Sequence, residues 1–333
     1  MQNKHKERYV VVRTVLITGV AGFIGSHLAH RLLDRGDIGV IGADSINSYY
    51  DTELKEDRLS KLESRELFSF NRLDISDQGS VRELFGRYKF DYVINLAAQA
   101  GVRYSKENPK SYIDSNIIGF YNIISASAAN GVQNFLYASS SSVYGSNTSI
   151  PFKESDAVDT PMSLYAATKI SNEALASSYY YSYGLKTIGM RFFNVYGAWG
   201  RPDMAYYKWA DALVAGNEIE LRESGNMWRD MTYVDDVVEA IDRLMSLDEI
   251  SFSKPEVFNI GNRSPVKISD MLDCIASGLS IVPKVKIVPK GEEEPIKTWA
   301  DTSKLYDRIG FMPNTDYRYG LSEFIKWYKD YKN

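Results

Sequence analysis

The sequence predicts an α/β protein in which a doubly wound parallel sheet is followed by a smaller α/β domain. Two observations carry this prediction. Short, near-continuous apolar segments alternate with helical spacing over roughly the first two thirds of the chain, which is typical of parallel strands buried on both faces. After Gly197 this alternation gives way to short elements separated by turns. We therefore predict a first domain at residues 1–190 and a second at 191–333, with some of its segments returning to the main sheet.

Each strand is predicted from an apolar run, and each helix from apolar residues that recur every three or four positions. The clearest strand is the run Tyr92-Val93-Ile94-Asn95-Leu96, and the clearest helix is the long segment 109–129. The expected strands are 10–17, 37–44, 67–74, 92–98, 134–139 and 185–194, with later ones at 257–260 and 285–287. The expected helices are 26–33, 53–63, 77–87, 109–129, 163–183 and a segment that ends near residue 215.

The turn between the first strand and the first helix contains three glycines spaced G-x-x-G-x-x-G, with Phe23 and Ile24 between the last two. Gly19 allows a tight turn, Gly22 lets the backbone approach a pyrophosphate, and Gly25 lets the helix pack against the strand. The start of the helix offers free N–H groups to phosphates. The turn is thus a candidate dinucleotide site, although an ordinary strand-to-helix turn also satisfies the spacing.

The second strand ends in the carboxylate of Asp44, about twenty residues after the glycines, where a ribose 2′-hydroxyl is held in dinucleotide-binding domains. A carboxylate repels a 2′-phosphate, and no arginine follows closely. The pattern therefore favours NAD over NADP and predicts an NAD-binding Rossmann-type first domain. The alternative is that Asp44 is only a turn residue at the end of a strand.

Composition limits the class of protein. The chain has 333 residues, 44% of them hydrophobic and 25% charged, with a net charge of −4, so nothing indicates a nucleic-acid or membrane partner. The single cysteine, Cys274, and three histidines make a metal site such as zinc unexpected and fit a reducing compartment. Residues 1–9 form a basic tail without the apolar core of a signal peptide. We expect a cytoplasmic protein.

The candidate catalytic residues are Tyr165, Lys169 and Ser140. Tyr165 and Lys169 lie one turn apart at the start of a predicted helix. A free tyrosine ionises near pH ~10, and a neighbouring ammonium favours the phenolate, so Tyr165 becomes a plausible proton acceptor for an alcohol. Ser140 lies in a row of serines that follows the fifth strand, where its hydroxyl can relay a proton to Tyr165. An exposed Tyr–Lys pair and a serine-rich turn are the structural alternatives.

Together these residues resemble the extended short-chain dehydrogenase/reductase superfamily. The segments 49–51, 96–105, 139–145 and 199–205 look more specifically like the UDP-glucuronate 4-epimerase group of nucleotide-sugar epimerases. The resemblance is strong from Val12 to Asp236 and weaker beyond. It implies NAD as the cofactor, a UDP-sugar as the substrate and a homodimer formed through helices 109–129 and 163–183.

The resemblance also implies roles for residues that the motifs alone do not reveal. Asp74 and Ile75 flank the adenine, and Asn116 holds the helix near the cofactor. The cofactor's central part is lined by Leu96, Ala97 and Ala98. The implied substrate residues are Arg103, Ser141, Ser142, Asn194, Arg201, Arg229 and Asp301, with Arg201 facing the C6 substituent of the sugar. Structural alternatives are a buried amide for Asn116, a helix cap for Asp301 and surface ion pairs for Arg201 and Arg229.

The resemblance implies a reaction in which Tyr165 takes the proton of the 4-hydroxyl, the sugar becomes a 4-ketone, and hydride and proton then return to it. The expected substrate is UDP-glucuronate. Asn194 and Trp228 depart from the uronate pattern, which leaves UDP-glucose, UDP-N-acetylglucosamine or a pentose as alternatives. Related dehydratases and decarboxylases carry carboxylates in the serine row, where this chain has Ser141 and Ser142. A dehydratase, a net oxidoreductase and a non-catalytic NAD-binding protein remain the rival interpretations.

Overall fold

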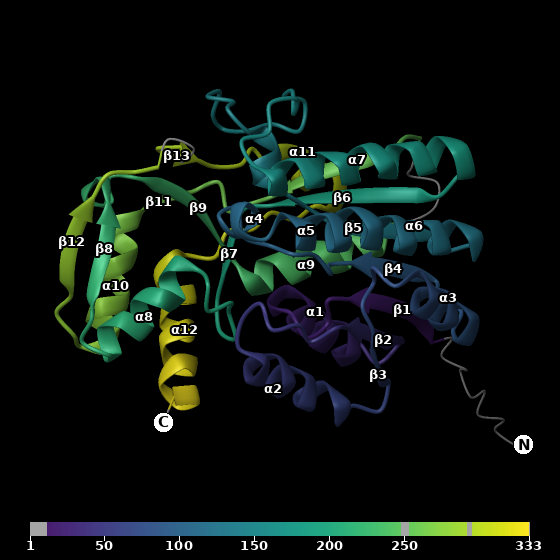
Figure 1. The fold of residues 1–333 in the computed structure, drawn as a ribbon, viewed down its shortest axis with the longest axis horizontal. Coiled ribbons are helices and arrows are strands. Elements are labelled where there is room, and N and C mark those ends of the chain that lie inside the picture. The colour runs from purple at the N-terminus through teal and green to yellow at the C-terminus, as the bar shows by residue number, and fades with distance from the viewer. Residues whose placement is uncertain (1–11, 248–252, 292–294, 333) are drawn as a thin grey trace, which may run out of the picture.

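The computed structural model describes residues 12–247, 253–291 and 295–332; the basic tail predicted at 1–9 lies outside them. Seven of its strands form one parallel sheet: β1 (Arg13–Thr18), β2 (Ile38–Asp44), β3 (Phe68–Arg72), β4 (Tyr92–Asn95), β5 (Asn134–Ser140), β6 (Lys186–Phe192) and β10 (Glu256–Ile260). Their order across the sheet is β10-β6-β5-β4-β1-β2-β3, and the part from β6 to β3 can be followed in Figure 1. The predicted doubly wound α/β fold is confirmed.

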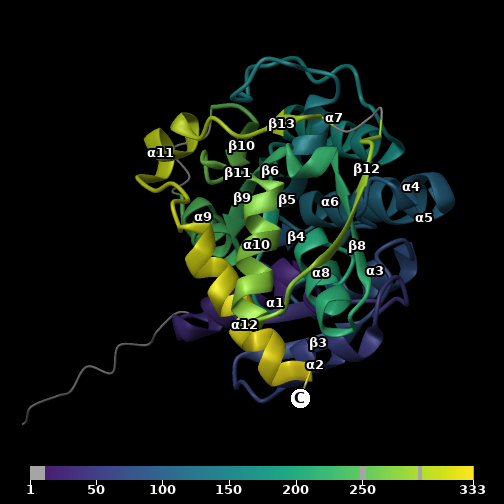
Figure 2. The same ribbon diagram turned by 90° about the vertical axis from the view of Figure 1, so that its left-hand side faces the viewer.

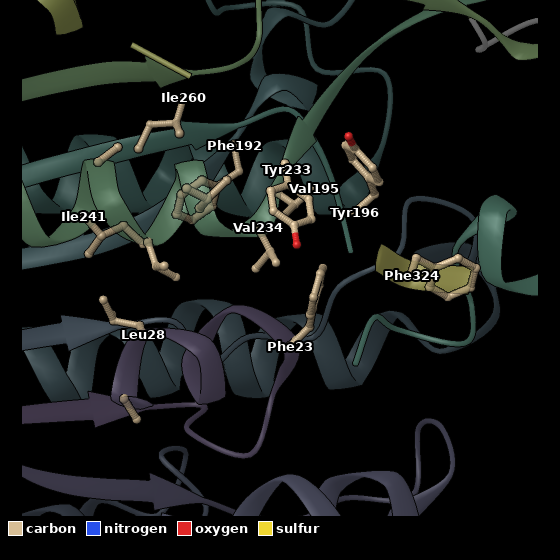
Figure 3. Close-up of a cluster of buried hydrophobic side chains, with 14 of the residues drawn as sticks. Phe23, Leu28, Phe192, Val195, Tyr196, Tyr233, Val234, Ile241, Ile260 and Phe324 are labelled. Carbon is tan, nitrogen blue, oxygen red and sulfur yellow. The ribbon is translucent and has the colours of Figure 1, made fainter. Parts of the chain in front are cut away.

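The sheet is covered on both faces, as its continuous apolar strands require. One face packs against α1 (Phe23–Asp34) and α9 (Val234–Met245), the other against α3 (Gln78–Arg87), α6 (Phe120–Ala129) and α7 (Leu164–Tyr183). Successive residues of β1 serve opposite faces, because Val15 and Ile17 join the first cluster and Leu16 joins the second. Figure 3 shows part of the first cluster, where Leu28 of α1 and Ile241 of α9 lie beside the sheet.

The long helix predicted at 109–129 is confirmed as one continuous helical segment, but its middle is a π-helix and not regular α-helix. After the short α4 (Tyr104–Glu107), the segment consists of α5 (Pro109–Tyr112), a π-helix η1 (Ile113–Gly119) and α6. At this π-helix, Asn172 of α7 donates to the Asn116 carbonyl at 2.6 Å. A side chain from a neighbouring helix therefore bonds to the backbone of the π segment, a wider turn that often marks a functional site.

The C-terminal half builds two smaller sheets and also completes the large one. β7 (Asn194–Tyr196), β9 (Trp228–Tyr233), β11 (Pro265–Lys267) and β13 (Lys297–Thr298) form one small sheet, and β8 (Glu218–Arg222) pairs with β12 (Lys284–Val288). The remaining elements are α2 (Thr52–Glu63), η2 (Ser141–Tyr144), α8 (Ala205–Val214), η3 (Glu223–Gly225), α10 (Ile268–Leu279), α11 (Ser303–Ile309) and α12 (Tyr317–Lys332). Figure 2 shows α10 and α12 side by side. The expected boundary after residue 190 falls inside β6, and β10 lies next to β6 in the main sheet.

Within the described residues, no helix is both long enough and apolar enough to cross a membrane.

Candidate active site

The glycine turn between β1 and α1 has the conformation that its spacing predicts. Gly19 has φ +72°, a left-handed conformation that favours glycine. A Cβ atom on Gly25 would lie only 2.2 Å from the Gly19 carbonyl oxygen, so the first turn of α1 can follow the loop this closely only with glycine there. The N-cap residue of α1, Gly22, provides no side-chain cap, so the N–H groups of the first turn remain for a phosphate group.

A cavity of 260 Å³ lies at the carboxyl ends of the parallel strands. The predicted cofactor residues that line it are Gly19, Gly22, Phe23, Ile24, Gly25, Asp44, Asp74, Ile75, Leu96, Ala97, Ala98, Tyr165 and Lys169. Asn116 is buried and is not among the lining residues. Its side chain accepts from the Gln99 amide at 2.8 Å and donates to Thr168 Oγ1 at 3.0 Å. Asn116 thus joins η1 to the β4 loop and to the helix that carries Tyr165.

Asp44 and the uncapped helix suit a dinucleotide such as NAD. The Asp44 carboxylate accepts hydrogen bonds from Ala21 N at 3.1 Å and from Ile46 N at 2.9 Å, which fix it at the end of β2 on the cavity wall. Burial raises its pKa, although these N–H groups and the nearby Lys55 ammonium oppose the shift. A ribose hydroxyl can donate to this carboxylate, while the first turn of α1 receives the pyrophosphate.

The three candidate catalytic residues lie together at the other end of the same cavity. Ser140 ends β5, and Tyr165 and Lys169 occupy the first turns of α7, which Ser163 caps by accepting from Ala166 N at 3.1 Å. The Ser140 hydroxyl lies close enough to Tyr165 to lower the pKa of its phenol, and both side chains line the cavity. Lys169 Nζ donates to the Ala138 carbonyl at 2.8 Å and lies 5.9 Å from the centre of the Tyr165 ring. The arrangement offers an alcohol both a proton acceptor and a relay.

The electrostatics of this group differ from our expectation of an acidified phenol. Burial raises the pKa of Tyr165, and it outweighs the effects of the nearby Ser140 hydroxyl and of the charge of Arg201, both of which lower the pKa. Burial also lowers the pKa of Lys169 to about 8. The lysine is therefore a weaker source of positive charge than an exposed ammonium, because its own charged form is disfavoured by the same desolvation.

The structure brings together fewer of the predicted substrate residues. Arg201 lines the cavity, and Ser142 donates to Ser140 Oγ from both its backbone N–H at 3.2 Å and its hydroxyl at 3.0 Å. Ser141 begins η2 beside them. The others lie elsewhere: Arg103 just before α4, Asn194 at the start of β7, Arg229 in β9, where it donates to the Trp228 carbonyl at 2.9 Å, and Asp301 in a separate 700 Å³ cavity. Asp301 accepts from Ser303 N at 2.9 Å, as a residue beside a helix start does.

Several residues that shape the site were not predicted. Asp203 pairs with Arg201 and also accepts from the Tyr49 hydroxyl at 3.1 Å. Arg58 of α2 is 2% exposed and bonds to the loop that precedes Arg201. The sequence placed Tyr49 and Asp203 inside recognisable motifs but gave no sign that they meet, and Arg58 looked like one charge among several on a polar helix.

A Rossmann-type sheet with a Tyr–Lys–Ser group on its dinucleotide cavity defines the chain as an NAD-dependent enzyme of the short-chain dehydrogenase/reductase type. The model of the family "NAD dependent epimerase/dehydratase" matches residues 15–261. The chain belongs to this family. The predicted NAD-dependent nucleotide-sugar epimerase family and its cofactor are thereby confirmed.

Two curated relatives align along nearly the whole chain. Protein CapI of Staphylococcus aureus is 46% identical over 95% of this chain and 98% of its own length. UDP-glucuronate 4-epimerase 4 of Arabidopsis thaliana is 43% identical over 96% of this chain and 76% of its own.

Solved structures with the same fold include enzymes with different sugars. UDP-glucuronic acid 4-epimerase from Bacillus cereus, in complex with UDP-glucuronic acid and NAD, matches with a TM-score of 0.88 and 29% identity, covering 96% of this chain and 99% of that one. UDP-glucose 4-epimerase from Thermotoga maritima, with UDP-glucose, matches with a TM-score of 0.85 and 27% identity, covering 96% and 100%.

Proposed function

We propose that this chain catalyses the NAD-dependent interconversion of UDP-sugars that differ at C4, with UDP-glucuronate and UDP-galacturonate as its main pair. The observation that carries the proposal is that Tyr165, Ser140 and Lys169 line one cavity together with the predicted dinucleotide residues, with Lys169 bonded to the Ala138 carbonyl. The named activities of the Arabidopsis relatives and of the Bacillus cereus structure support it.

The residues divide the chemistry among them. The glycine turn and Asp44 would hold NAD, which would supply the acceptor and donor of hydride at C4. Tyr165 has to be a phenolate to accept the proton of the 4-hydroxyl. Burial disfavours this form, while the Ser140 hydroxyl, the Arg201 charge and the Lys169 ammonium favour it. After the keto sugar turns over in the cavity, Tyr165 returns the proton to its oxygen. No net proton is gained or lost, so one phenol serves both halves of the reaction.

Epimerisation is favoured over elimination by what surrounds Tyr165. Among the described residues that line the cavity, the carboxylates are Asp44 and Asp74, and both belong to the cofactor end. Elimination of a neighbouring hydroxyl needs a further acid and base near the sugar, but Ser141 and Ser142 occupy the turn that follows Ser140. The ketone is therefore expected to be reduced again rather than to react further.

The choice of sugar rests on Arg201. Its guanidinium lines the cavity, and its charge acts on Tyr165, so it is placed to meet an acidic C6 substituent of a sugar that reacts there. Asn194 and the Trp228 side chain, which stands where a second basic residue is expected, favour the alternative of a neutral sugar such as UDP-glucose. The Thermotoga maritima neighbour is consistent with that alternative.

Incubation of the purified protein with separate UDP-sugars, without added cofactor, tests the proposal. We expect UDP-glucuronate to yield UDP-galacturonate, and Tyr165→Phe to lower the rate by about 100-fold or more because the proton acceptor is lost. Accumulation of a keto sugar or of free NADH in place of the C4 epimer would contradict epimerisation. Conversion of UDP-glucose in preference to UDP-glucuronate would contradict the choice of substrate.

We propose in addition that the chain forms a homodimer through the α5–η1–α6 segment and α7. Both carry exposed apolar side chains, Ile113, Ile118 and Tyr121 on the first and Tyr181 and Tyr183 on the second. Two-fold pairing of such helices buries these groups in the commonest kind of closed assembly. Light scattering coupled to size exclusion should give twice the mass of the chain, and a monomeric mass at micromolar concentration would contradict this.

A further inference from the structure

Arg201 does not stand alone at the cavity. Its Nε donates to Asp203 Oδ1 at 2.9 Å and its Nη2 to Asp203 Oδ2 at 2.5 Å, which is a two-point contact along one edge of the guanidinium. The Tyr49 hydroxyl donates to the same carboxylate at 3.1 Å. The Arg201 and Asp203 side chains are 23% and 22% exposed, so water weakens the attraction between their charges only in part.

This contact uses one side of the guanidinium and leaves the other side for a ligand. Arg201 has five N–H donors, of which Asp203 takes one on Nε and one on Nη2. The donors of Nη1 are thus available to a group in the cavity that Arg201 lines. Asp203 therefore orients Arg201 while its own negative charge offsets the positive charge that the arginine presents.

The other lining cations serve different ends of the cavity. Lys55 donates to the Asn47 carbonyl at 2.5 Å and to Asn47 Oδ1 at 2.8 Å, beside the Asp44 end. Lys169 donates to the Ala138 carbonyl behind Tyr165. Among the cations of the described residues that line the cavity, Arg201 is the one whose charge lowers the pKa of Tyr165, so it is the one that an acidic group on the reacting sugar would meet. The same group would also be repelled by the nearby carboxylate of Asp203.

We propose that Asp203 is a specificity-determining residue, which through its charge limits the preference of Arg201 for acidic over neutral sugars. The inference rests on the proposed UDP-sugar activity. With Asp203 charged, Arg201 and Asp203 form a pair without net charge. A sugar with a neutral hydroxymethyl group can therefore bind beside Arg201 without leaving the arginine charge uncompensated. A carboxylate gains hydrogen bonds from Nη1 but is opposed by Asp203. A site built this way accepts both classes of sugar, with the balance between them set by one acidic side chain.

The test is Asp203→Asn, which keeps the size of the side chain and removes its charge. We expect the ratio of kcat/KM for UDP-glucuronate to kcat/KM for UDP-glucose to rise by at least about tenfold, since a like charge a few ångströms from the sugar carboxylate is gone. The ratio of the two dissociation constants, measured by calorimetry, should shift in the same direction. Asp203→Ser should shift both ratios likewise, which keeps the test available if one variant folds poorly.

Tyr49→Phe is the matched control, because it removes a hydrogen bond from Asp203 without changing its charge. Its substrate ratio should stay within about twofold of wild type if charge is what matters. A ratio in Asp203→Asn and Asp203→Ser that is unchanged or lower contradicts the role of Asp203. Wild-type protein that epimerises neither sugar contradicts the proposed function itself, and this result is obtained before any variant is compared.

Discussion

Replacing Arg58 should show that the cofactor turn and the substrate loop are held by one side chain. From α2, the Arg58 guanidinium donates to the Trp199 carbonyl at 2.6 Å, the Gly200 carbonyl at 2.9 Å and the Ala21 carbonyl at 3.1 Å. It also donates to the Tyr50 hydroxyl at 2.8 Å. Ala21 lies inside the glycine turn, and Gly200 directly precedes Arg201. The guanidinium therefore joins the glycine turn to the loop before Arg201, and Arg58 lies 141 positions before Trp199 in the sequence.

The magnitude follows from the carbonyl groups that Arg58→Met leaves behind. Each buried acceptor without a donor costs about 1–3 kcal/mol, so the buried Ala21 and Gly200 carbonyls give several kcal/mol before relaxation, and the carbonyl of the half-buried Trp199 adds less. Removal of a buried charge and entry of water offset part of this. We expect unfolding to become easier by about 3 kcal/mol. The backbone of Trp199 is itself strained, with φ +57°, and its ring packs against Trp327 and Tyr331 of α12. In Arg58→Met this strained residue loses the hydrogen bonds that hold its carbonyl.

Urea denaturation and steady-state kinetics together check this prediction. Arg58→Met should also raise KM for the UDP-sugar and lower the NAD content of the purified protein, because both loops lose a common anchor. Arg58→Lys keeps the charge but lacks the planar fork, so we expect intermediate values. Arg82→Met on the exposed side of α3 is the control and should change stability by less than about 0.5 kcal/mol. Unchanged stability and KM in Arg58→Met would refute the reasoning.

Two further predictions concern the groups behind Tyr165. Because burial lowers the pKa of Lys169 to about 8, its side chain is charged below that pH and neutral above it. We therefore expect kcat/KM to fall as pH rises through about 8. A kcat/KM profile that stays flat to pH ~10 contradicts this. Glu173→Gln should destabilise the fold by about 3–5 kcal/mol in urea titrations, since the buried Arg191 loses its counter-charge at 2.7 Å. It should also lower kcat, because Glu173 accepts from Ser139 at 2.5 Å, next to Ser140.

The parts of the fold and site that sequence could predict are those encoded locally. The glycine turn, the strand ends and the one-turn spacing of Tyr165 and Lys169 depend on neighbours in sequence, and the structure places them as expected. The π-helix, whose Asn116 carbonyl accepts a hydrogen bond from Asn172 of another helix, has no local sequence pattern that predicts it. The pKa of Tyr165 was misjudged because burial outweighs charge, and burial is a property of the folded packing.

The same distinction explains why the substrate side was harder to predict than the cofactor side. NAD residues follow strands of one sheet, so topology alone gathers them. The residues around Arg201 are gathered by contacts between distant segments: Tyr49 reaches Asp203 across 154 positions, and Arg58 reaches Trp199 across 141. Each of these contacts joins the first half of the chain to the loop after β7. The sugar end of the cavity is therefore built between the two halves: the Arg201–Asp203 pair lies within that loop, and Tyr49 and Arg58 from the first half of the chain bind to the same loop.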